Sequence, residues 1–229
     1  MKPHLKQQWC LGNLTTLFLW KMEQILAVYS RPYNPKRPQI CVDERPCQLI
    51  EDILVPLPME PGKPKREDYE YKRNGICTVF IAFEPHTGFR IVEVRKRRTK
   101  QDYAAFMQRV AQHPRYAQAE QIIIVQDNLN THNPGSFYTL LPPDEAFALG
   151  QQFEMVFTPK KASWLNMAEI EFSVLSRQCL NRRIGDQDVL EREVLAWAET
   201  RNQKQVTVHW QFTVEQARIK FGRFYPELA

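Results

Sequence analysis

The first patterned segment of the chain is residues 14–30, where apolar side chains recur at the spacing of a helix. The positions that share its apolar face are Phe18, Met22, Ile25, Leu26 and Tyr29. Residues 31–39, RPYNPKRPQ, hold three prolines, which break a helix. We therefore expect a helix over residues 14–30 that is followed by an extended lead-in to the first strand.

Strands are expected next, because apolar runs now alternate with turn residues. Residues 39–50, QICVDERPCQLI, form the first candidate strand and carry Asp43 and Glu44 near its centre. Residues 76–94 indicate two strands around the turn EPHTG. The intervening residues 55–75 contain four prolines and mixed charges, and they predict a long surface loop. Three consecutive strands of this kind favour antiparallel neighbours.

From residue 99 onwards, segments whose apolar residues have the spacing of a helix alternate with short apolar runs that indicate strands. Thr99 and Asp102 fit a capping box, in which two side chains satisfy free backbone donors at a helix start, and Pro114 closes that helix. The strands expected after it are IIIVQDN (122–128) and FEMVFTP (153–159). The helices expected after it are 143–152, a long helix capped by Ser163 and running to residue 180, 188–202 and 213–221.

This order of elements predicts the fold class. Three strands, followed by helices alternating with two more strands, indicate an α/β protein with a mixed five-stranded sheet flanked by helices on both faces. The ribonuclease H-like fold has this order, and in that fold the first and fourth strands lie side by side at the centre. Asp43 and Asp127, one on each of those strands, should then converge.

Bulk composition changes this picture little. The chain has 229 residues, of which 43% are hydrophobic and 25% charged, so one domain with one good core is expected. Its net charge of +5 is compatible with a polyanionic partner but does not require one. Five scattered cysteines without a CxxC pair argue for reduced thiols and against zinc. Charged and polar side chains interrupt residues 14–29, so we expect no membrane span.

Acidic side chains supply the candidate chemistry. Asp127 directly follows IIIVQ, at the carboxyl end of a strand, where open α/β sheets place their ligands. Two converging carboxylates repel each other unless a cation neutralises them, and such oxygen-rich sites favour Mg²⁺ or Mn²⁺. A third acid would come from Glu169 or Glu171, which lie two positions apart on a helix and point in different directions. Only one of these two can face the aspartates.

Three blocks of sequence resemble the catalytic motifs of bacterial insertion-sequence transposases of the mariner-like superfamily. They are VDE at 42–44, VQDNLNTHNPG at 125–135 and FTPKKASWLNMAEIEF at 157–172. The resemblance runs from about residue 14 to the end of the chain. It implies a DDE superfamily endonuclease domain of ribonuclease H-like fold, with its acidic triad at Asp43, Asp127 and Glu169. Glu169 matches because it stands three positions after Asn166, as the family's acid does.

The resemblance further implies two-metal chemistry on DNA. Two Mg²⁺ or Mn²⁺ ions, roughly 3.5–4 Å apart, would flank a phosphodiester, one activating the attacking oxygen and the other stabilising the leaving oxygen. The expected activity is that of a metal-dependent DNA endonuclease and strand transferase, which cuts and joins DNA at transposon ends. Two alternatives stay open: a general ribonuclease H-like nuclease, and a truncated remnant that binds DNA or partner subunits without transposing.

One feature departs from the mariner pattern. The gap of 42 positions from Asp127 to Glu169 is longer than in that branch. We expect the surplus to be a surface insertion in residues 143–152.

Basic and polar residues near the acids are candidates for DNA contacts and for support of the site. The candidate DNA contacts are Arg95, Arg97, Arg98, His132, Lys160 and Lys161. The arginine cluster is either a solvated surface or a grip on the DNA backbone, whereas the two lysines, just before the helix of Glu169, could meet phosphates at the cut. His132 either lies near the metals and the backbone or caps a turn. Asn128 and Asn166 would support the site, unless Asn128 only makes an Asx turn.

The expected organisation is an N-terminal helix and linker in residues 1–35, followed by a DDE catalytic domain with C-terminal helices in residues 36–229. About 30 residues precede the lead-in to the first strand, too few for the helix-turn-helix modules with which relatives read transposon ends. We therefore expect a truncated gene copy, the second half of a split reading frame, or another chain that supplies DNA recognition, and no sequence-specific transposition by this chain alone. The resemblance also implies a homo-oligomer in a synaptic complex with transposon-end and target DNA, in the bacterial cytoplasm at the nucleoid.

Overall fold

A five-stranded sheet forms the centre of the computed structural model, which describes residues 14–226. Its strands are β1 (Gln39–Asp52), β2 (Tyr71–Glu84), β3 (Phe89–Arg95), β4 (Ile122–Gln126) and β5 (Phe153–Phe157). The order across the sheet is β3-β2-β1-β4-β5. β2 is antiparallel to both β1 and β3, whereas β4 is parallel to both β1 and β5. The predicted mixed sheet, with its first and fourth strands adjacent, is confirmed.

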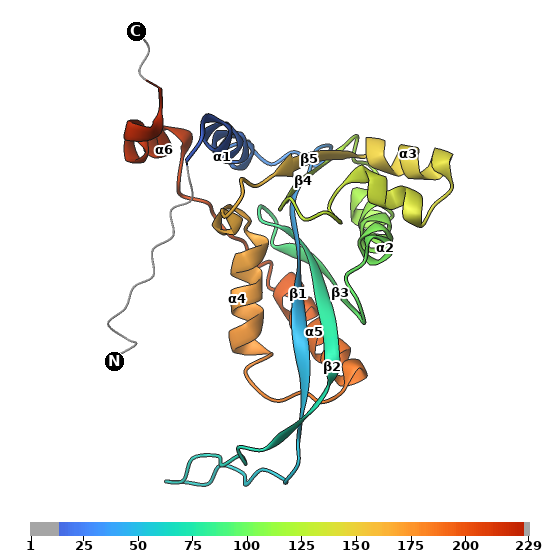
Figure 1. Cartoon of the computed structure of the whole chain (residues 1–229), viewed down its shortest axis with the longest axis vertical. Coiled ribbons are helices and arrows are strands. Elements are labelled where there is room, and N and C mark those ends of the chain that lie inside the picture. The colour runs from blue at the N-terminus through green and yellow to red at the C-terminus, as the bar shows by residue number, and fades with distance from the viewer. Residues whose placement is uncertain (1–13, 227–229) are drawn as a thin grey trace.

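Helices cover both faces of this sheet (Figure 1). They are α1 (Thr16–Tyr29), α2 (Lys100–Ala111), α3 (Pro143–Gln151), α4 (Ala168–Gln178), α5 (Gln187–Gln203) and α6 (Val214–Lys220). One core packs α1, α4 and α5 on one face, and a second packs α2 and α3 on the other. Strand alternation divides the cores, since Val79 and Ile81 point into the first and Phe80 and Ala82 into the second. None of the described helices is long and apolar enough to cross a membrane.

Helix α2 begins at the predicted capping box. Thr99 Oγ1 accepts the backbone N–H of Asp102 at 3.2 Å, and the Asp102 carboxylate accepts the backbone N–H of Thr99 at 2.9 Å. The helix ends at Ala111, and Pro114 begins a separate 3₁₀ turn. The cap fixes the start of the helix and therefore the face that buries Tyr103 against the sheet.

The helix that carries Glu169 begins later than the sequence predicts. Ser163 does not cap it, because Ser163–Leu165 form a separate 3₁₀ turn and α4 starts only at Ala168. The interruption is at Asn166, whose backbone is extended with ψ 114°. The side-chain oxygen of Asn166 accepts the N–H of Ala168 at 3.1 Å and so satisfies a donor at the true start of the helix.

β1 and β2 are longer than predicted and project from the body of the molecule as a twisted ribbon (Figure 1). Their pairing extends to Asp52 on β1 and Tyr71 on β2. The loop between the strands therefore covers residues 53–70 and not the predicted 55–75. We call residues 53–70 the hairpin arm. Two isolated bridges hold the arm together. Its exposed apolar side chains are Ile53, Leu54, Val55, Leu57, Met59 and Tyr69.

Residues 143–151, within the stretch where we expected a surface insertion, form α3. This helix buries Ala146 and Leu149 in the second core, while Phe147 is exposed. α3 leads directly into β5, which is the edge strand of the sheet.

The expected N-terminal segment of residues 1–35 is described only in part. Residues 16–29 form α1, as the apolar pattern predicts, and residues 1–13 lie outside the described residues. The four cysteines within the described part, Cys41, Cys47, Cys77 and Cys179, are free thiols. Cys10 lies outside it.

Candidate active site

Strand register places Asp43 and Asp127 level with each other on the two central strands. β1 and β4 run parallel, and their pairing ends with Cys41 opposite Val125; continued by two positions, this register sets Asp43 opposite Asp127. Neighbouring strands are about 4.8 Å apart. Asp127 follows the last residue of β4, so both carboxylates lie where the parallel pairing ends.

The Asp43 carboxylate is held by two donors and surrounded by negative charge. Its Oδ1 accepts the backbone N–H of Glu44 at 2.9 Å, and its Oδ2 accepts Nδ2 of Asn166 at 3.3 Å. Burial, together with the charges of Glu169, Glu44 and Asp127, raises the pKa of Asp43 to about 7, against the backbone hydrogen bond from Glu44, which lowers it. Glu169 and Asp127 therefore both lie within electrostatic reach of Asp43, and a cation beside Asp43 would relieve the repulsion.

Asn166 connects β1 to the start of α4. It is buried, and its Nδ2 also donates to the carbonyl oxygen of Val42 at 2.9 Å, while its Oδ1 holds the N–H of Ala168. One amide thus fixes the strand that carries Asp43 relative to the first turn of the helix that carries Glu169.

Glu169 and Glu171 point in different directions, as their spacing requires. Glu169 is exposed, and its charge acts on Asp43. Glu171 is 0% exposed and forms ion pairs with Arg90 Nε at 2.9 Å and Arg201 Nη2 at 2.8 Å. Glu171 is therefore committed to binding β3 and α5 together, and Glu169 is the acid of this helix that is available to the site.

His132 lies between two carboxylates. Its Nδ1 is 2.6 Å from Asp127 Oδ1, which also accepts the N–H of Leu129, and its Nε2 is 2.7 Å from Glu44 Oε2. Burial lowers the pKa of His132, but the hydrogen bonds to Asp127 and Glu44 outweigh it and raise the pKa to about 9. The ring is 1% exposed and packs on Tyr103, with centroids 4.8 Å apart. His132 thus has no surface to offer DNA, contrary to the expected contact.

Asp127 differs electrostatically from Asp43. Burial raises the pKa of Asp127, but the hydrogen bonds from His132 and Leu129, with the charges of His132 and Arg98, outweigh it and lower the pKa. Asp127 is therefore ionised at neutral pH, whereas Asp43 is close to its titration point. No hydrogen bond within residues 14–226 uses Asp127 Oδ2, so this oxygen is available to a cation.

The donor set fits a divalent ion shared with substrate. Within residues 14–226, no three His, Cys, Asp or Glu side chains lie close enough together to form a ready-made metal site. Mg²⁺ is usually held by one or two carboxylates together with water and substrate phosphates, and not by a closed protein cage. Level carboxylates, a raised pKa at Asp43 and an available oxygen on Asp127 match that behaviour.

The candidate basic residues differ in whether protein carboxylates already pair with their charge. Arg95 is paired with Glu93 at 2.5 Å and Asp102 at 3.6 Å, with 23% of its side chain exposed, so its charge is already committed. Arg97 and Arg98 are exposed, and the charge of Arg98 acts on Asp127. Lys160 and Lys161 are exposed on the segment between β5 and α4.

Asn128 supports the end of β4 rather than making an Asx turn. Its Nδ2 donates to the carbonyl oxygen of Thr158, after β5, and its Oδ1 accepts Lys21 Nζ at 3.4 Å. The Asx-type hydrogen bond at this point is made by Asp127, whose Oδ1 accepts the backbone N–H of Leu129. Beside Asn128, a cleft of about 290 Å³ is lined by Lys21 and Lys160, among others.

Two side chains near the acids were not expected from the sequence. The sequence predicts Glu44 only as a strand residue. Its partner His132 lies 88 positions away, so their pairing produces no local sequence pattern. Lys21 lies on a helix whose apolar face was predicted, but nothing in the sequence places that helix beside β4. The only available signal was that VDE puts a second acid directly after Asp43.

A mixed five-stranded sheet with acids level on its central strands, and a further acid on the helix after the last strand, defines a ribonuclease H-like domain. A family model described as DDE superfamily endonuclease matches residues 38–191. The chain belongs to this family. None of the curated proteins matches the chain.

Solved structures of the mariner Mos1 transposase are similar in fold. The paired end complex with Mn is 14% identical over 87% of this chain and 62% of that chain, with a TM-score of 0.57. The Mos1 strand transfer complex is 12% identical over 89% of this chain and 62% of that chain, also with a TM-score of 0.57. The chain thus spans less than two thirds of the length of these Mos1 chains, and the likeness confirms the ribonuclease H-like fold.

Proposed function

We propose that this chain is the catalytic domain of a transposase, which cuts and joins DNA phosphodiesters at transposon ends. The observation that carries the proposal is the level placement of Asp43 and Asp127 on adjacent parallel strands, with Asn166 tying the helix of Glu169 to the same point. The family supports an endonuclease, and the similar Mos1 structures include a paired end complex and a strand transfer complex.

Three acids would hold the divalent ions. Asp127 is ionised and offers Oδ2, Asp43 would lose its proton as the cation binds, and Glu169 is exposed on the substrate side of α4. Two Mg²⁺ or Mn²⁺ ions at these oxygens would activate the attacking water or 3′-hydroxyl and stabilise the leaving oxygen. His132 keeps Asp127 Oδ1 occupied and so turns the other oxygen toward the ion.

The cations around the acids would contact the DNA backbone. Arg98 acts on Asp127, and Lys160 and Lys161 come directly before the 3₁₀ turn and helix that carry Glu169. Their contacts with phosphate would position DNA without reading its sequence. Arg97 is exposed in the same cluster as Arg98. We do not include Arg95, because Glu93 and Asp102 already neutralise it.

The assembly we propose is a homo-oligomer on paired DNA ends, formed by a catalytic domain over residues 36–229. The hairpin arm supports it, because a two-stranded projection with six exposed apolar side chains has no core of its own to cover them. Replacing the arm with a short turn should leave the melting temperature unchanged and abolish DNA-induced oligomers in light scattering. Its substrate would be nucleoid DNA.

The function is tested by nicking of DNA in Mg²⁺ or Mn²⁺. We expect wild-type protein to nick a supercoiled plasmid and DNA carrying the element's ends, and to require the metal. Asp43→Asn, Asp127→Asn and Glu169→Gln should each abolish nicking while the far-UV circular dichroism spectrum stays that of the folded protein. Asp144→Asn, an exposed acid on α3, is the matched control and should nick normally.

Two outcomes would contradict the proposal. Nicking that survives Asp127→Asn would show that another site does the chemistry. A preference for RNA–DNA hybrids over duplex DNA, lost in the same three variants, would assign the site to a general ribonuclease H-like nuclease instead.

A further inference from the structure

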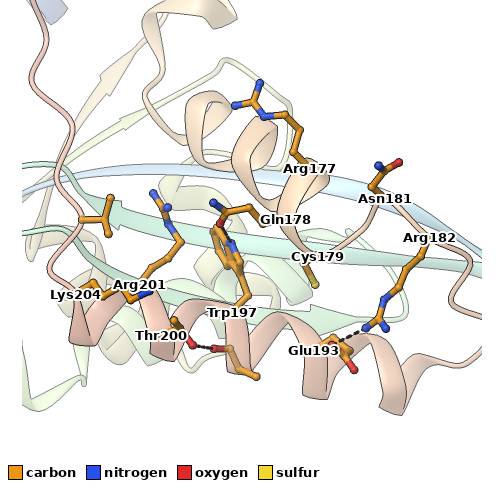
Figure 2. A pocket seen from close by; sticks show the side chains of 12 residues that line it. Arg177, Gln178, Cys179, Asn181, Arg182, Glu193, Trp197, Thr200, Arg201 and Lys204 are labelled. Atoms are coloured by element: carbon orange, nitrogen blue, oxygen red, sulfur yellow. Dashed lines mark hydrogen bonds and ion pairs between the residues drawn. The ribbon is translucent and has the colours of Figure 1, made fainter. Parts of the chain in front are cut away.

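A groove lies between the end of α4 and α5, at the opposite end of α4 from Glu169 (Figure 2). Its volume is about 810 Å³. From Glu169 to Arg177, in the last turn of α4, the helix rises about 12 Å. We call this cavity the α4–α5 groove. None of the three candidate acids lines it.

The groove has a surplus of positive charge. Its charged lining residues are Arg177, Arg182, Arg201, Lys204 and Glu193. The single acid, Glu193, is taken by Arg182 Nη2 at 2.6 Å, and Arg201 is paired with the buried Glu171. Within residues 14–226, Arg177 and Lys204 form no ion pair, and both are exposed. An anionic ligand would therefore find two cations without competition from protein carboxylates.

The floor of the groove suits a sugar-phosphate backbone better than a base. Trp197 is 8% exposed, its indole N–H donates to Gln178 Oε1 at 3.0 Å, and the Arg201 guanidinium lies over its ring at 5.4 Å. A ring covered in this way is closed to base stacking, which is how proteins commonly grip single strands. The exposed donors at the rim are Arg177, Asn181 and Lys204. Such donors bind phosphate oxygens without reading sequence.

We propose that the α4–α5 groove binds the phosphate backbone of duplex DNA, as a second contact within about one duplex turn of the cut. The inference rests on the proposed function, because the duplex that reaches the groove is the one whose phosphodiester lies at the acids. The 12 Å rise along α4 corresponds to about four base-pair steps of 3.4 Å. Binding there fixes the direction in which the duplex leaves the acids.

The test compares two double variants that remove the same charge. Arg177→Gln/Lys204→Gln removes the free cations of the groove, and Arg192→Gln/Lys220→Gln removes cations on α5 and α6 that do not line it. Binding to a duplex of several turns is measured by fluorescence anisotropy in EDTA over a range of salt concentrations. The groove variant should bind about tenfold more weakly, with a log–log salt slope smaller by about 1.8, since each phosphate contact contributes about 0.9. The control should match wild type.

A second variant keeps the test independent of folding. Asn181→Asp adds one negative charge at the exposed rim and breaks no ion pair, so it should also weaken binding at an unchanged melting temperature. Nicking by wild-type protein in Mn²⁺ is measured alongside. If wild-type protein nicks DNA and the groove variants bind DNA as tightly as wild type, the proposal that the groove binds DNA is refuted and the proposed function stands. If wild type neither binds nor nicks, both fail.

Discussion

His132 Nδ1 lies 2.6 Å from Asp127 Oδ1, so a buried imidazole holds one of the three acids of the site in place. The same ring holds Glu44, whose side chain is 3% exposed. Removing the ring leaves Glu44 as a buried charge without a partner, so we expect His132→Ala to lower the free energy of unfolding by about 3–5 kcal/mol. Nicking should fall about 10- to 100-fold, as for other residues that orient metal ligands. Urea unfolding and nicking rates measure the two effects.

The double variant Glu44→Leu/His132→Leu separates positioning from stability. Replacing both partners with apolar side chains leaves no buried charge, so most of the lost stability should return. Asp127 would still lack its hydrogen-bond donor, and nicking should stay low. Recovery of nicking together with stability would show that His132 serves only the fold.

The two glutamates of α4 should give opposite phenotypes. Glu169→Gln should abolish nicking with an unchanged melting temperature, because this side chain is exposed and proposed to hold metal. Glu171→Gln should lower the free energy of unfolding by about 3–5 kcal/mol, because it leaves Arg90, itself 2% exposed, without its carboxylate. Below its melting transition, this variant should nick normally. A stable but inactive Glu171→Gln protein would reverse the assignment of the third acid.

Much of the fold follows from local patterns. The apolar run 122–125 specifies one strand, the capping box at Thr99 the start of one helix, and the alternation in 76–94 a pair of strands, all with little help from distant residues. The element order then restricts the sheet to few topologies, which is why the adjacency of β1 and β4 could be predicted. The start of α4 could not, because it depends on Asn166 reaching Val42, 124 positions away.

From the sequence, only the candidate acids of the site could be proposed. Asp43, Asp127 and Glu169 lie at strand or helix positions that motif spacing reveals, whereas their surroundings are built from distant parts of the chain. Arg95 shows this limit: in sequence it belongs to a basic cluster, but in the fold Glu93 and Asp102 neutralise it. His132, likewise, could not be assigned to a buried bridge without knowing where Glu44 lies.

Acid should weaken the docking of the C-terminal helix α6. Glu23 on α1 accepts hydrogen bonds from Arg218 Nη2 at 2.7 Å and Tyr225 Oη at 2.6 Å. The bond from Arg218 lowers the pKa of Glu23 against burial, which raises it. A carboxyl with a lower pKa when folded contributes stability above its unfolded pKa and loses it as pH falls through the folded pKa. We expect α6 to loosen below about pH 4. The NMR chemical shifts of its backbone amides, recorded over a range of pH, measure this change.

Glu23→Gln provides the control for this transition. The amide cannot titrate, so α6 shifts should resemble those of the loosened form and keep only the acid titration of Glu215, which lies on α6 itself. Because Arg218 is 60% exposed, the change in stability should not exceed about 1 kcal/mol. An unchanged acid transition in Glu23→Gln would assign it to other carboxyls.

Lys160 and Arg95 should differ in their effect on DNA binding, although both are cations near the acids. Lys160 is exposed, so Lys160→Gln should weaken binding to all sequences alike and reduce the log–log salt slope by about 0.9, the contribution of one phosphate. Arg95→Gln should leave the slope unchanged, because its charge is already neutralised by Glu93 and Asp102. Anisotropy titrations at several salt concentrations compare the two. A smaller slope for Arg95→Gln would show that DNA displaces its acidic partners, and the basic cluster would then be a DNA contact as a whole.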